Sequence, residues 1–151
     1  MLKMDRDALT AFLARDFPQV CDDFALDRVA EDGLTVRLRV ADRHLRPGGT
    51  VSGPSMFALA DVAVYLAILS RLGPVALAVT TNCSIDFMRK PASGVDLSCD
   101  VRLLKLGRAL AVGDCLLRSV GMEAPVARAS LTYSIPPGPG GGETRPDPAP
   151  D

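Results

Sequence analysis

The longest apolar stretch of the chain, PSMFALADVAVYLAILS at 54–70, places hydrophobic residues on every face of a helix and carries a single charge, Asp61. Ser52 can cap this helix, Pro54 suits its first turn, and Gly73-Pro74 is a stop signal. About 17 residues at 1.5 Å each give roughly 25 Å of helix, long enough to cross a sheet. An isolated carboxylate on such a helix is costly unless it is paired or used.

A membrane span is the alternative for this stretch. Its apolar centre, 56–69, is shorter than the roughly 20 residues that a bilayer requires, and it contains Asp61. We therefore expect a buried core helix and no membrane partner.

Alternation of apolar and polar residues predicts strands on both sides of this helix. Before it, 24–40 is expected to form a hairpin that turns at Asp32-Gly33, preceded by an amphipathic helix at 5–15. After it, four strands are expected, at 77–88, 95–105, 109–120 and 124–135. In the first of these the apolar residues fall on odd positions, which predicts that Thr81 faces inward and Asn82 outward.

Strands joined by short turns form an antiparallel sheet, and its apolar face must be covered. The only helix long enough is 54–70, so the sequence predicts an α+β domain whose sheet wraps around one long central helix. We expect one domain over 1–135. The remainder, 136–151, is so rich in Pro and Gly that it is predicted to be disordered. Because the helix is apolar all round, one of its sides is expected to meet a second subunit.

Composition narrows the function. The net charge of −1 and the absence of Trp argue against a nucleic-acid partner. Four cysteines without a CxxC pair and a single histidine argue against a zinc site, and no metal is expected. Free cysteines in predicted strands suit a reducing compartment, and the charged N-terminus does not resemble a signal peptide, so we expect a cytoplasmic protein.

The order of elements, with one helix set between the second and third strands, resembles the hotdog fold. The run HLRPGGTVSGP from His44 to Pro54, followed by Leu59-Ala60-Asp61, resembles the loop and L-x-D helix of PaaI-like (phenylacetate-pathway) hotdog thioesterases. Downstream, Asn82 with FMRKP at 87–91 resembles the N-x-x-F-x-x-P strand of that family, and LKLGR at 104–108 resembles its K-x-G-R turn.

This resemblance implies hydrolysis of an acyl-CoA thioester, with coenzyme A as part of the substrate and no separate cofactor. Asp61 would act as general base or nucleophile, and the backbone N–H of Gly53 would stabilise the oxyanion. The first N–H groups of a helix are unpaired and lie at its positive dipole end, which independently supports the role of Gly53. In that family the two residues come from different protomers, so a homodimer is implied, and such dimers commonly pair into tetramers.

Further residues are candidates for substrate binding. Ser52 offers a hydroxyl beside Gly53, and the basic residues are suited to the phosphates of CoA. The predicted set comprises Ser52, Arg46, Thr81, Asn82, Arg89, Lys105, Gly107 and Arg108. His44, the only histidine, is expected to be a loop residue hydrogen-bonded to backbone.

Two other functions remain open. Arg46, Ser52 and Pro54 stand where the family has Asn, His and Gly, which favours a non-catalytic acyl-CoA or small-ligand binding module as the alternative. A hotdog dehydratase ranks lower, because His44 and Asp61 are farther apart than its His and Glu pair. A helix-turn-helix regulator is disfavoured by the short segment before the first predicted strand.

Overall fold

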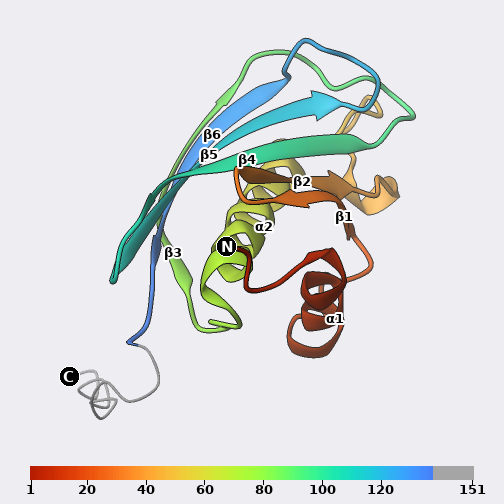
Figure 1. The fold of residues 1–151 in the computed structure, drawn as a ribbon. Coiled ribbons are helices and arrows are strands. Elements are labelled where there is room, and N and C mark those ends of the chain that lie inside the picture. Colours follow the sequence, from red (N-terminus) through yellow and green to blue (C-terminus); the bar gives the residue numbers. More distant parts are fainter. Residues whose placement is uncertain (138–151) are drawn as a thin grey trace, which may run out of the picture.

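The computed structural model describes residues 1–137 (Figure 1). One curved antiparallel sheet wraps around the long helix α2, and a shorter helix, α1, packs beside it (Figure 1). The elements are α1 Arg6–Asp16, β1 Phe24–Ala30, β2 Gly33–Leu38, the 3-10 helix η1 Asp42–His44, α2 Gly53–Leu72, β3 Val79–Phe87, β4 Leu97–Leu106, β5 Leu110–Ser119 and β6 Ala127–Ser134. This confirms the predicted α+β hotdog architecture. The tail predicted at 136–151 lies outside the described residues, apart from its first two prolines.

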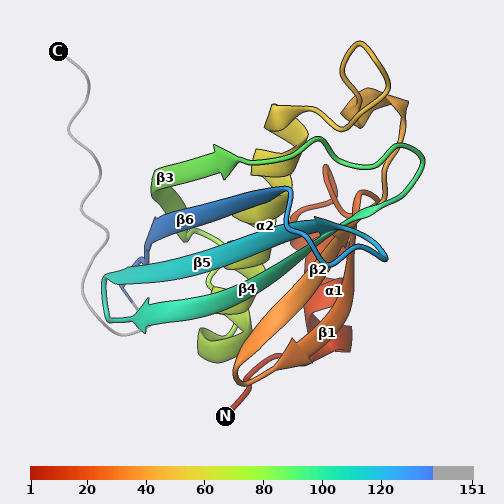
Figure 2. The ribbon, with the colours of Figure 1, turned by 90° about the horizontal axis from the view of Figure 1, so that it is seen from above.

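The strand order across the sheet is β1-β2-β4-β5-β6-β3 (Figure 2). The last three strands of the chain form the expected meander, and β1 pairs with β2 as the expected hairpin. β3 follows α2 in sequence but pairs with β6 at the far edge of the sheet. Its outer side is therefore free of any strand among the described residues.

The ends of α2 have local causes. The Ser52 hydroxyl accepts a hydrogen bond from the Ser55 N–H at 3.3 Å, Pro54 occupies the first turn, and Gly73 closes the helix with a positive φ of 91°. At Gly53–Leu72 the helix is three residues longer than predicted, and by length and composition alone it could cross a membrane. However, 67% of its most apolar window is buried inside the fold, as the core helix of a domain would be.

The core lies between α2 and the concave face of the sheet. On α2, Leu59, Ala63, Leu66 and Ile68 are completely buried. Burial alternates along β2, β5 and β6, so that one face of each of these strands meets the helix. α1 covers the helix from outside the sheet, with Leu9, Phe12 and Leu13 buried.

The predicted orientation of Thr81 was wrong. Thr80 pairs with Tyr133, and Asn82 pairs with Thr132, so Thr81 is the extra residue of a β-bulge. The bulge turns Thr80 toward α2, whereas Thr81 is exposed and donates from its hydroxyl to the Thr132 carbonyl at 3.3 Å. Asn82 is exposed, as predicted.

Two apolar residues of β3 were also misplaced by the alternation. Val79 and Phe87 were expected to face inward, yet they are 56% and 51% exposed. β3 is the edge strand, and the single helix does not cover its full length. Burial within one chain therefore does not explain why these two positions of β3 are apolar.

Candidate functional site

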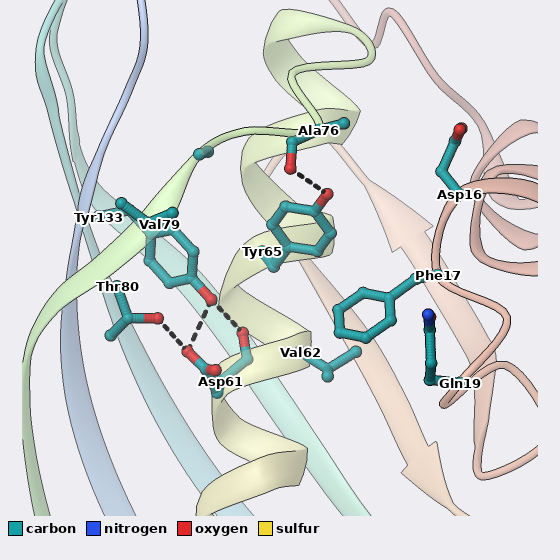
Figure 3. Close-up of a pocket in the computed structure, with 11 residues that line it drawn as sticks. Asp16, Phe17, Gln19, Asp61, Val62, Tyr65, Ala76, Val79, Thr80 and Tyr133 are labelled. Atoms are coloured by element: carbon teal, nitrogen blue, oxygen red, sulfur yellow. Dashed lines mark hydrogen bonds between the residues drawn. The ribbon is translucent and has the colours of Figure 1, made fainter. Parts of the chain in front are cut away.

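Asp61 lies in the third turn of α2, on the side that faces β3 and β6, and is partly buried. Its Oδ1 accepts a hydrogen bond from the Thr80 hydroxyl at 2.5 Å and one from the Tyr133 hydroxyl at 2.6 Å (Figure 3). The Tyr133 hydroxyl also lies 2.9 Å from the backbone oxygen of Asp61. Oδ2 has no hydrogen-bond partner among the described residues. The lone carboxylate is thus held by two neutral hydroxyls and not by an arginine.

Asp61 forms one wall of a pocket of about 550 Å³, within the size range of small-molecule sites (Figure 3). Aromatic and small aliphatic side chains line most of it, and two polar residues from the end of α1 and the following loop complete it. The lining residues are Asp16, Phe17, Gln19, Asp61, Val62, Tyr65, Ala76, Ala78, Val79, Thr80 and Tyr133. The pocket therefore combines an apolar surface with one carboxylate that is fixed in place.

Aromatic contacts make the pocket wall rigid. The Tyr65 ring stacks on Tyr133 with centroids 6.2 Å apart, and the edge of Phe17 meets Tyr65 at the same distance. The Tyr65 hydroxyl donates to the Ala76 carbonyl at 3.0 Å. Burial, reinforced by the negative charge of Asp61, raises the pKa of Tyr133 well above its usual value. Tyr133 therefore remains a neutral hydrogen-bond donor at physiological pH.

Gly53 begins α2, and its N–H has no acceptor among the described residues. A Cβ at this position would lie 3.3 Å from Cζ of Phe87, so the glycine sits close beside β3. Asp61 is eight residues further along the helix, which is about 12 Å along the axis. The two predicted catalytic positions are therefore not brought together within one chain.

The loop before α2 is organised by His44, which is buried. Its Nδ1 accepts a hydrogen bond from the Ala41 N–H at 2.9 Å, and its carbonyl accepts one from the Ser52 N–H at 2.8 Å. Its Nε2 lies 3.4 Å from Asp23. Burial acts to raise the pKa of Asp23, but the hydrogen bond from Arg43 and the nearby His44 imidazole outweigh it and lower that pKa. His44 is thus a structural residue of the loop, as expected.

Known proteins with related sequences identify the family of this chain. A model of the family described as the Thioesterase superfamily matches residues 48–126, which include α2 and the strands β3, β4 and β5. The chain belongs to the Thioesterase superfamily. It is also 33% identical over 107 residues to a proposed esterase of Pseudomonas aeruginosa, a match that covers 71% of this chain and 78% of that protein.

Solved structures support the same family. A crystal structure of a proposed thioesterase from Silicibacter sp. TM1040 is 64% identical, with a TM-score of 0.86 and coverage of 91% of this chain and 95% of that one. The phenylacetic acid degradation protein PaaI of Thermus thermophilus, in a mutant form, is 27% identical, with a TM-score of 0.67 and coverage of 78% and 98%. The hotdog resemblance drawn from the sequence is therefore confirmed.

In this member of the superfamily, the predicted substrate-binding residues lie outside the Asp61 pocket of a single chain. Ser52 is the N-cap of α2, with its hydroxyl 3.0 Å from that of Ser55. Arg46 is exposed and its backbone closes a turn with Thr50. Thr81 and Asn82 are exposed on the edge strand. None of these side chains approaches Asp61.

The remaining basic candidates lie elsewhere on the surface. Arg89 is exposed and donates to the Pro125 carbonyl at 2.7 Å. Lys105 lies near the end of β4, and Gly107 and Arg108 lie in the turn between β4 and β5, at the opposite end of the sheet from the loop that precedes α2 (Figure 1). One chain therefore does not gather them into a single phosphate site.

Sequence reasoning missed Thr80 and Tyr133, the two residues that contact the Asp61 carboxylate. Thr80 was assigned to the outward face because the bulge leaves no mark in the alternation. Tyr133 shares one side of β6 with the apolar residues of that strand and is buried, and a buried tyrosine normally finds a hydrogen-bond partner. That signal could have linked it to Asp61, the only acidic residue on the covering helix.

Proposed function

We propose that this protein hydrolyses an acyl-CoA thioester to a free acid and coenzyme A. The observation that carries the proposal is the Asp61 carboxylate, whose Oδ1 is held by two hydroxyls while Oδ2 is left unpartnered at a pocket in a thioesterase fold. Aromatic and small aliphatic side chains in the pocket can contact an acyl group, and polar groups beside them can contact the thioester. The 27% identity to PaaI of Thermus thermophilus supports the PaaI-like assignment.

The chemistry requires a base or nucleophile and an oxyanion donor. As general base, Asp61 takes a proton from water while the water oxygen adds to the thioester carbonyl carbon. The C–S bond then breaks, and the proton passes to the departing sulfur of coenzyme A. As nucleophile, Asp61 would instead attack the carbonyl carbon and expel the CoA thiolate, which leaves an acyl anhydride on Asp61. Water then cleaves the anhydride to the free acid and the Asp61 carboxylate, and its proton goes to the thiolate. Either route uses the unpartnered Oδ2.

The oxyanion donor is assigned to Gly53 of a partner subunit. Within one chain about 12 Å separates Gly53 from Asp61, too far for both to reach one carbonyl group. A homodimer removes this difficulty by placing the start of one α2 near the middle of the other. The free edge of β3 and the exposed apolar residues near it support such a dimer. These are Phe57, Val79, Phe87 and Met88.

The same arrangement gives the basic residues a role. Arg46, Arg89, Lys105 and Arg108 are exposed, and each is a candidate contact for CoA phosphates once two chains are combined. No cofactor beyond the CoA of the substrate is needed for this chemistry. All four cysteines are free, which supports the proposed cytoplasmic location.

Thiol release from a panel of aromatic and medium-chain acyl-CoAs tests the proposal. Wild type should release thiol, and Asp61→Asn should lower kcat by roughly 10²–10⁴-fold, as expected when a general base is lost. The matched control is Asp86→Asn, which removes a carboxylate that pairs with Arg128 on the surface at 2.8 Å and should keep wild-type activity. If wild type and Asp61→Asn were equally inert but both bound CoA esters, the binding-module alternative would be correct. Hydration of an enoyl-CoA without thiol release would favour the dehydratase.

Mixing two inactive variants tests the shared site. Asp61→Asn and Gly53→Pro each damage a different half of the composite site. After unfolding and refolding together, half of the dimers should be mixed and each mixed dimer should hold one intact site, so about a quarter of wild-type activity should return. No recovery, with mixed dimers present, would show that the two residues do not act across an interface.

A further inference from the structure

We propose that Tyr133 is a positioning residue for Asp61, holding Oδ1 together with Thr80 so that Oδ2 is the oxygen that reacts. This inference rests on the proposed thioesterase function. It adds a residue on β6, outside the loop, helix and strand motifs on which the resemblance was based.

The two hydroxyls are fixed relative to each other by the sheet. Thr80 and Tyr133 are directly paired in the β3–β6 ladder, and the bulge at Thr81 puts Thr80 on the same face as Tyr133. Both hydroxyls meet one atom, Oδ1 of Asp61, at 2.5 and 2.6 Å. Hydrogen bonds to a charged oxygen are short and strong. Two such bonds to Oδ1 prevent the carboxylate from rotating and distinguish its two oxygens.

Tyr133 is itself held rigidly. Its side chain is 3% exposed, and its ring stacks on Tyr65 with an interplanar angle of 25°. The raised pKa of Tyr133, caused first by burial and then by the Asp61 charge, keeps the hydroxyl protonated. A buried neutral hydroxyl on a fixed ring donates a hydrogen bond that orients the carboxylate, and the carboxylate keeps its negative charge.

The Tyr133 hydroxyl lies within one cluster, formed with Asp61 and Thr80. Its contacts at 2.6 and 2.9 Å are both to atoms of Asp61. Tyr65 differs, because its hydroxyl donates to the Ala76 carbonyl and so ties α2 to the loop before β3. A phenylalanine at 133 would keep the packed ring and remove the contacts of the hydroxyl with Asp61 and Thr80.

Steady-state kinetics of Tyr133→Phe test this. We expect kcat to fall by roughly 10- to 100-fold, the range for losing a hydrogen bond to a charged group, while KM stays within about twofold of wild type. Thr132→Val is the control: it removes a hydroxyl from the neighbouring residue on the outer face of β6 and should leave kcat unchanged. A wild-type kcat in Tyr133→Phe, or a change confined to KM, would overturn the inference.

A spectroscopic test covers the case in which Tyr133→Phe does not fold. With 3-fluorotyrosine at 133, which keeps the ring and hydroxyl, the ¹⁹F resonance should move when Asp61→Asn is added and should not move with Asp86→Asn. No movement with Asp61→Asn would overturn the inference. If wild type released thiol from no acyl-CoA, the proposed function would fail together with this inference. An active wild type with an unaffected Tyr133→Phe would refute this inference alone.

Discussion

Val64 of α2 packs directly against the backbone of Gly113 in β5. A Cβ at Gly113 would lie 2.9 Å from both methyl carbons of Val64, closer than real Cβ contacts come. The central helix therefore comes close to the sheet at a position where the strand has no side chain. Val64 is one turn beyond Asp61, so this contact also sets how near Asp61 approaches Tyr133 and Thr80.

Adding a methyl group at this contact should push the helix away from the sheet. We expect Gly113→Ala to lower the free energy of unfolding by about 1–3 kcal/mol, the usual cost of overpacking a core. Urea denaturation measures this. In the double variant Val64→Ala/Gly113→Ala the new methyl gains room, so its total loss should be smaller than the sum of the two single losses. Strict additivity would show that the two residues do not compete for the same space.

The fold could be predicted to the extent that it depends on local signals. Ser52, Pro54 and Gly73 act within a few residues of themselves, so the start of α2 was correct to one residue and its end to two. The place of β3 depends on where a long helix returns the chain, and nothing within 77–88 encodes that. The bulge at Thr81 cannot be predicted from the local sequence either, because it depends on the register of β3 with β6.

The residues of the candidate site also differ in whether local sequence signals predict them. Asp61 was recognisable as an isolated charge in an apolar helix. Its partners come from strands β3 and β6, far from it in sequence, and only pairing across the sheet brings Thr80 and Tyr133 to one oxygen. Gly53 was identified as a helix-start donor, but its distance from Asp61 becomes a constraint only when the helix is seen as continuous.

The cap of α2 should contribute measurably to stability. Ser52→Ala removes the acceptor for the Ser55 N–H and should lower the free energy of unfolding by about 1 kcal/mol. Ser52→Asp keeps a capping oxygen and should stay near wild type. Thermal or urea unfolding of both variants measures the difference. Equal losses in the two variants would mean that packing of Ser52, and not capping, stabilises the loop.

Stability at low pH should depend on Asp23. Its pKa is lowered from the ordinary 3.8 in the folded protein, since Arg43 and His44 outweigh burial. The ionised group therefore favours the folded state above about pH 4, and that contribution is lost as the pH falls through the lower folded value. Asp23→Asn should be less stable than wild type at pH 7, and the two should converge toward pH 2–3. Denaturation midpoints across this range, with Asp22→Asn as the neighbouring control, test it. A constant gap at all pH values would rule out this linkage.

The N–H of Gly53 can be removed without disturbing the helix. Ser52 has an extended backbone with ψ 156°, which suits a residue before proline, and proline is accepted in the first helical turn. Gly53→Pro should therefore fold, yet lose kcat by roughly 10²–10³-fold, the usual effect of removing one oxyanion donor.

Gly53→Ala is the control for this prediction, because it adds a Cβ beside the same Phe87 ring but keeps the N–H. Since the ring is half exposed and can shift, Gly53→Ala should keep a kcat within a few-fold of wild type. Comparison of the two kcat values, with Tm as the check on folding, isolates the N–H from the added bulk. If both variants lost kcat equally, the damage would come from the contact with Phe87, and Gly53 would not be the oxyanion donor.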